Sequence, residues 1–162
     1  MESQILAILE FNVTVPSCYR FLERFARLSN LEIAHLANAQ GSGSTGLRTF
    51  MFARYLTELA LVDYNMLRYT PRQVAAAAIY IALRLMKFNP PWNENLVRAS
   101  NMTETELKPC ARELMGILDG SEKANLKAIR KKYSQKKFME VSKIKLDVQK
   151  TEDTFWAINL VI

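Results

Sequence analysis

Pro71 to Met86, with the sequence PRQVAAAAIYIALRLM, is the stretch that decides the fold. Apolar residues occur on every side of a helix drawn through it, four consecutive alanines at 75–78 among them, and a helix that is hydrophobic all round is normally buried. At about 24 Å such a helix is too short to cross a membrane. Thr70 and Gln73 predict a capping box at its start, with Pro71 at the first helical position. The stretch therefore predicts a central core helix on which other helices pack.

Amphipathic patterns lie on both sides of this core helix. The spacing of apolar residues predicts helices over 1–11, 17–28, 47–62, 103–118 and 122–133, with shorter helical segments between them. Thr103 and Glu106 predict a second capping box, and Pro109 predicts a bend or a displaced start in the helix that follows. No segment has a convincing strand pattern. The predicted fold class is all-α, with five main helices around residues 71–86 and short accessory helices.

Composition and residue inventory favour a globular binding protein over an enzyme. The 162 residues are 49% hydrophobic and 23% charged, with a net charge of +6 that favours an acidic partner. His35 is the only histidine, and no metal-ligand spacing, nucleophile elbow or P-loop lysine occurs. Cys18 and Cys110 lie far apart and predict free thiols in an intracellular protein. The sequence therefore predicts no enzymatic activity, no cofactor, no metal site and no membrane span.

A basic cluster near the C-terminal end allows two interpretations. Its members are Arg130, Lys131, Lys132, Lys136 and Lys137, interleaved with Tyr133 and Phe138. Basic and aromatic side chains together can neutralise phosphates and stack on bases. Lysines near a helix C-terminus are also favoured by the helix dipole, and such a cluster is then simply a solvated helix end. Both interpretations stay open at this point.

Several long segments resemble the second cyclin box of mitotic, A/B-type cyclins. The resembling stretches are 9–25 (LEFNVTVPSCYRFLERF), 52–86 (FARYLTELALVDYNMLRYTPRQVAAAAIYIALRLM), 92–96 (WNENL), 103–115 (TETELKPCARELM) and 132–142 (KYSQKKFMEVS). The resemblance implies a cyclin-box bundle of five helices with the third one central. It also implies a non-catalytic regulatory subunit of a cyclin-dependent protein kinase in cell-cycle control. Such a subunit holds the kinase's regulatory helix and activation loop in the active arrangement.

The same resemblance divides the chain and points to kinase-binding residues. Residues 1–13 resemble the last helix and exit of the first cyclin box, whose other parts are absent from this sequence. Residues 14–143 resemble the C-terminal box with an insertion at 29–46, and 144–162 match nothing familiar. By resemblance, Glu2, Leu6 and Val13 take the kinase-binding positions, although the family's histidine after the glutamate is Ser3 here. Because the family's first box makes most of the kinase contact, weak kinase binding is expected.

Two further expectations and two alternatives follow. Helix 1–11 is expected to expose an apolar face and so to promote self-association. A location in the nucleus or cytoplasm is expected for such a protein. One alternative is a nucleic-acid-associated cyclin-fold adaptor that uses the basic region 127–145. The other is a chain with the cyclin fold and no retained kinase function.

Overall fold

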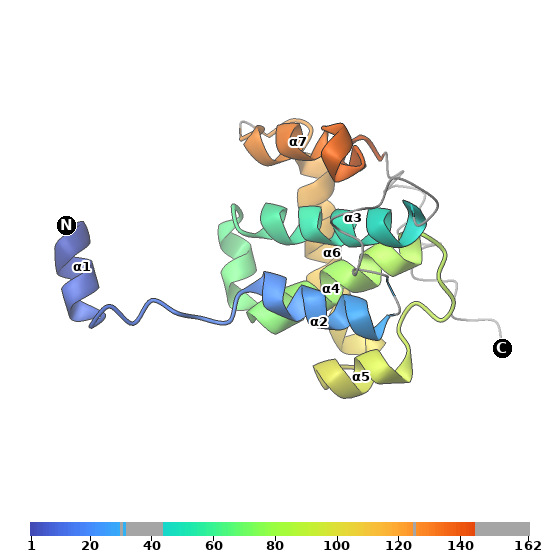
Figure 1. Ribbon diagram of the computed structural model, residues 1–162, viewed down its shortest axis with the longest axis horizontal. Coiled ribbons are helices and arrows are strands. Elements are labelled where there is room, and N and C mark those ends of the chain that lie inside the picture. The colour runs from blue at the N-terminus through green and yellow to red at the C-terminus, as the bar shows by residue number, and fades with distance from the viewer. Residues whose placement is uncertain (30, 32–43, 125, 145–162) are drawn as a thin grey trace.

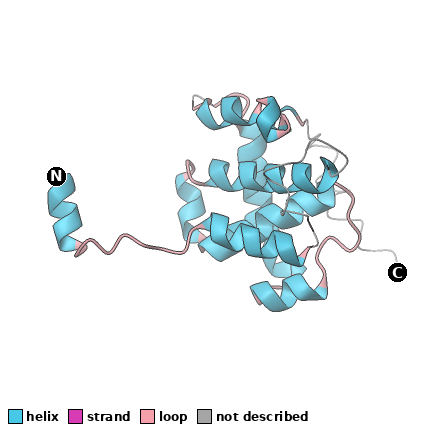
Figure 2. Cartoon of the chain, viewed as in Figure 1, coloured by secondary structure: helices cyan, strands magenta, loops and turns pink. Residues whose placement is uncertain are grey.

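A computed structural model describes residues 1–29, 31, 44–124 and 126–144 of the chain. Within these ranges the secondary structure is helical and contains no strand (Figure 2), which confirms the predicted all-α class. The α-helices are α1 (Glu2–Ile8), α2 (Cys18–Leu28), α3 (Ser44–Ala60), α4 (Pro71–Leu85), α5 (Glu94–Ser100), α6 (Glu104–Gly120) and α7 (Ala128–Tyr133). Three short 3₁₀ helices are η1 (Tyr64–Arg68), η2 (Lys136–Phe138) and η3 (Val141–Lys143).

Helix α4 is the central helix, as the sequence predicts. Every residue from Val74 to Leu83 is buried, because α2, α3 and α6 pack against α4 from different sides (Figure 1). The predicted capping box closes its first turn. The Gln73 amide donates to the Thr70 hydroxyl over 3.3 Å, and the Gln73 side-chain oxygen accepts from the Thr70 amide over 2.9 Å. The alanine run keeps the helix thin enough for neighbours to approach on several sides.

Helix α6 packs along α4 and begins at its predicted capping box. Glu106 accepts a hydrogen bond from the Thr103 amide over 2.7 Å, and the helix starts at Glu104. Pro109 therefore does not displace the start of the helix, one of the two effects predicted for it. The buried face of α6 is formed by Leu107, Cys110, Ala111, Leu114, Met115 and Leu118. These positions repeat at the helical period, so α6 offers one continuous apolar stripe to the core.

Three tyrosine–glutamate hydrogen bonds hold separate elements together. Each phenol donates to a carboxylate that a basic side chain also contacts. The groups are Tyr133 with Glu58 (2.7 Å) and Lys132, Tyr80 with Glu104 (2.6 Å) and Arg84, and Tyr69 with Glu113 (2.7 Å) and Arg68. The first joins α7 to α3 and the second joins α4 to α6. Because Tyr133 and Tyr80 are fully buried, their hydroxyl groups need these acceptors.

We expect Glu58→Gln to lower the free energy of unfolding by about 1–2 kcal/mol at pH 7, since it weakens charge-assisted hydrogen bonds. Burial opposes ionisation of the Glu58 carboxyl, but hydrogen bonds from Lys132 and Tyr133 and the charges of Lys132 and Arg54 outweigh it and hold its pKa below the usual value. This stabilisation is present above the unfolded-state pKa of about 4.3 and is lost as pH falls through the folded-state pKa.

Urea unfolding of the parent chain and Glu58→Gln between pH 7 and pH 3 measures this effect. The difference between the two proteins should shrink in the acid range. Glu94→Gln is the matched control, because the Glu94 side chain is 89% exposed in its ion pair with Arg98 and such a pair contributes little. A constant difference across the pH range would contradict the role given to the Glu58 carboxylate.

The predicted start is wrong for two helices of the bundle. The helix predicted over 122–133 forms only from Ala128, because Leu126 is 70% exposed and gives a longer helix no buried anchor. The helix predicted from Leu47 begins at Ser44 instead. An added turn is closed there by the Thr49 hydroxyl, which donates to the Thr45 carbonyl over 2.7 Å. Residues 44–46 of the insertion predicted at 29–46 lie in α3. Residues 30 and 32–43, with His35, lie outside the described residues.

Helix α1 is shorter than predicted and lies apart from the bundle. It covers Glu2–Ile8 in place of 1–11, and none of its residues is buried. Glu10 and Phe11 adopt positive φ angles of 49° and 57°, so the chain turns there and cannot continue the helix. Figure 1 shows α1 separated from the bundle by the stretch that leads to α2.

Candidate functional site

The N-terminal segment, residues 1–15, is the most apolar exposed part of the described chain. Its exposed large apolar residues are Met1, Ile5, Ile8, Leu9, Phe11, Val13 and Val15. Apolar groups gathered on one exposed segment are typical of interaction surfaces. The pattern arises because α1 is amphipathic yet has no partner helix within the described residues to cover its apolar face. This segment is therefore the first candidate for binding another protein.

Two of the three predicted kinase-binding residues share a face of α1. Glu2 and Leu6 are four residues apart on the helix and so lie one above the other. Glu2 is exposed and Leu6 is half-buried. Val13 is 58% exposed and lies beyond the turn at Glu10 and Phe11, away from the helix. The structure thus brings Glu2 and Leu6 together as a carboxylate beside an apolar contact, and it leaves Val13 on a separate stretch.

Some residues of the basic cluster form ion pairs with other parts of the fold. Lys132 forms hydrogen bonds of 2.7 and 2.8 Å with Glu58, and Arg130 pairs with Glu122 at 2.7 Å. Tyr133 is fully buried, so its ring is not available to stack on a base. Phe138 packs against the core and lies beside Lys132 and Lys137. Lys131, Lys136 and Lys137 remain exposed. This geometry gives no support to the nucleic-acid alternative and matches a solvated helix end.

A groove between α2 and α5 gathers arginines that the sequence leaves far apart. We call it the arginine groove; it has a volume of about 670 Å³ and is lined by Arg20, Glu23, Arg24, Arg27, Leu28, Asn95, Arg98 and Ala99. The sequence pattern places the α2 arginines on a solvent face. It does not reveal that α5 brings Arg98 to the same groove, because only the packing of α5 beside α2 does so.

A second hollow, of about 770 Å³, opens between the end of α3 and α6. Its large apolar lining residues are Leu59, Val62, Ile117 and Leu126. Gly116 and Gly120, one helical turn apart on α6, also line it, and a side-chain carbon at either glycine would meet no atom within 4 Å. The hollow is therefore unfilled beside these two glycines of α6. Three large residues near Val62 in sequence are strongly exposed, with exposed fractions between 73% and 85%: Leu61, Tyr64 and Leu67.

Groups suited to catalysis do not converge in the described residues. No cluster of three or more His, Cys, Asp or Glu side chains in that part of the chain could hold a metal ion. Cys18 and Cys110 are free thiols, and burial raises the pKa of Cys110 to about 12, so its thiolate is scarce at neutral pH. None of the helices described is both long and apolar enough to span a membrane.

Comparison with known proteins points to one family. Residues 16–147 match the family model described as cyclin, C-terminal domain. A G2/mitotic-specific cyclin-B of Dictyostelium discoideum is 40% identical over 145 residues, or 89% of this chain and 30% of the relative. A cyclin-A1-1 of Oryza sativa subsp. japonica is 34% identical over 88% of this chain and 27% of its own length. A G2/mitotic-specific cyclin-B of Marthasterias glacialis is 34% identical over 89% of this chain and 34% of its own length.

Proposed function

The chain belongs to the cyclin family, and we propose that it acts as a regulatory subunit of a cyclin-dependent protein kinase in cell-cycle control. The match over residues 16–147 to the C-terminal domain of cyclins carries this proposal. The relatives named above are A-type and B-type cyclins, and two of them are G2/mitotic-specific. Such a role is regulatory and not catalytic. The chain spans about 30% of the length of these relatives, so the activity and partners of a whole cyclin are part of the proposal.

The N-terminal segment is the surface that we assign to the kinase. Glu2 can accept charge-assisted hydrogen bonds from a basic side chain of the kinase, and Leu6 on the same helical face supplies an apolar contact. Binding that favours the active kinase conformation over the inactive one shifts the kinase population toward activity. A single short helix covers far less than the roughly 1,200–2,000 Å² buried in a stable interface. The proposed interaction is therefore weak.

Calorimetric titration of the chain into a cyclin-dependent kinase, with a parallel kinase assay, tests the proposal. We expect measurable binding that Glu2→Lys weakens at least about tenfold, the loss expected for a charge-assisted contact worth about 1.5–3 kcal/mol. Glu10→Lys is the matched control, because it makes the same charge change on the same exposed segment outside α1. Equal effects of both substitutions, or no binding by the parent chain, would refute the assignment of Glu2.

Self-association through the N-terminal segment is a second part of the proposal. Ile8 and Phe11 are 80% and 70% exposed, and pairing of two copies would bury these side chains. We expect sedimentation velocity to show a concentration-dependent dimer that Ile8→Asp with Phe11→Asp abolishes. The control substitution Leu67→Asp changes an apolar residue that is 73% exposed on η1. A monomer at every concentration, or equal loss of dimer in the control, contradicts this part.

A kinase partner also implies a location in the nucleus or cytoplasm.

A further inference from the structure

The arginine groove has a positively charged lining. Its lining contains four arginines and one glutamate, a net charge of +3, which is half of the +6 carried by the whole chain. Arg20 forms a loose ion pair of 3.7 Å with Glu23, and Arg98 one of 3.4 Å with Glu94. Within the described part of the chain, Arg24 and Arg27 form no ion pair. The groove is thus positively charged, and two of its four arginines, Arg24 and Arg27, have no compensating carboxylate among the described residues.

The three arginines of α2 place like charges close together on one face of the helix. Arg20, Arg24 and Arg27 are spaced by four and three residues and form a single stripe, and like charges at these spacings repel each other. Arg20 lies in the first turn of α2, where the helix dipole disfavours a positive charge. An anion bound along the stripe would relieve both effects. Arg27, in the last turn, already interacts favourably with the helix dipole, so an anionic ligand would relieve chiefly the repulsion between the arginines and the position of Arg20.

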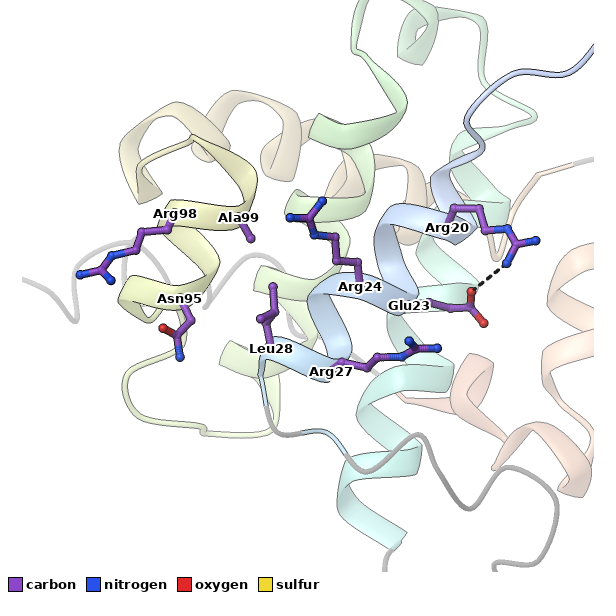
Figure 3. A pocket seen from close by; sticks show the side chains of 8 residues that line it. All are labelled: Arg20, Glu23, Arg24, Arg27, Leu28, Asn95, Arg98 and Ala99. Carbon is purple, nitrogen blue, oxygen red and sulfur yellow. Dashed lines mark ion pairs between the residues drawn. The ribbon is translucent and has the colours of Figure 1, made fainter.

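The spacing of the arginines and the apolar lining of the groove suit an extended peptide. Figure 3 shows Arg24 and Leu28 on the side of α2 that faces α5, with Ala99 on α5 across from them. Leu28 and Ala99 are half-buried and give the groove an apolar element beside its charged side chains. Arg20 and Arg24 are about 6 Å apart along the helix axis. Side chains on one face of an extended chain recur at about 6.6 Å, every second residue.

We propose that the arginine groove binds an acidic peptide segment of a partner protein, in an extended conformation with carboxylates at alternate positions. Arginine suits this ligand because its planar guanidinium can hold a carboxylate with two parallel hydrogen bonds. The exposed cations of the basic cluster are lysines instead. The groove is formed by α2 and α5, whereas the kinase surface proposed above lies on α1. The two proposals are therefore independent.

Fluorescence anisotropy with the intact chain and a labelled twelve-residue peptide of alternating Glu and Ser tests the proposal. We expect binding at low salt that weakens as salt screens the charges, and no binding of the same peptide with Gln in place of Glu. Arg24→Glu with Arg27→Glu should weaken binding at least about tenfold. Lys131→Glu with Lys136→Glu makes the same charge change at exposed positions of the basic cluster and should change binding less than about twofold.

Thermal melts of both double variants accompany the titrations, and all four substituted side chains are exposed, so both variants are expected to stay folded. Equal weakening in the two variants would show that net charge alone attracts the peptide, which overturns the site. Equal binding of the Glu and Gln peptides overturns it as well. Tighter binding of a short DNA duplex than of the acidic peptide would overturn the choice of an acidic peptide as the ligand.

Discussion

Ala77→Asp is expected to prevent cooperative folding of the chain. Ala77 is fully buried in α4, so a carboxylate introduced there would be removed from water. An unpaired buried charge is among the few changes that cost more than about 4 kcal/mol, and a domain of this size has only about 5–15 kcal/mol of stability. Circular dichroism and urea unfolding measure the loss.

Arg72→Asp provides the control on the same helix. Arg72 is exposed in the first turn of α4, where a carboxylate interacts favourably with the helix dipole. The free energy of unfolding should stay within about 0.5 kcal/mol of the parent value. A folded Ala77→Asp protein with parent-like stability would mean that α4 is not the centre of the fold.

Phe25→Ala should lower the free energy of unfolding by about 3–5 kcal/mol, the usual cost of truncating a buried phenylalanine. Phe25 is fully buried on the face of α2 that carries Leu22 and Ala26. Removal of its ring leaves a cavity between α2 and the rest of the core, because the helices cannot close over it completely. Equilibrium unfolding in urea, with the midpoint and slope compared between proteins, measures the change.

Phe11→Ala is the matched control, because it is the same substitution at a phenylalanine that is 70% exposed in the N-terminal segment. Its expected effect on stability is below about 0.5 kcal/mol. A large loss in Phe11→Ala would show that the N-terminal segment packs on the bundle. A small loss in Phe25→Ala would contradict the core position of α2.

Local sequence signals predict the parts of the fold that depend on local physics. The stretch from Pro71 to Met86 predicts a buried helix from its apolar surface alone, and Thr70 with Gln73 fixes where it begins. The buried residues Leu22 and Phe25 of α2 also follow from helical spacing. The resemblance of residues 52–86 to mitotic cyclins is confirmed by the match to the C-terminal domain of cyclins. In each case the residues that carry the signal lie close together in sequence.

The features that the sequence does not reveal depend on contacts between distant residues. Glu58 meets Tyr133 and Lys132 across more than 70 positions, and no periodicity indicates such a pair. Arg24 and Arg98 line one groove only because α5 packs beside α2. The early end of α1 at Ile8 reflects backbone turns at Glu10 and Phe11. Helical periodicity through MESQILAILEF continues past that point and so overestimates the helix.

Hydrogen exchange of the chain, measured alone and with a cyclin-dependent kinase, tests most directly the proposal that this cyclin contacts the kinase through the N-terminal segment. In the free chain, at concentrations where it is monomeric, amides of the buried helix α4 should exchange slowly, and those of residues 2–13 should exchange quickly. With kinase present, we predict new protection over 2–13, centred on Glu2 and Leu6, and unchanged exchange along α2 and α5. Protection confined to the bundle, or none at concentrations where the kinase is bound, would contradict the proposal.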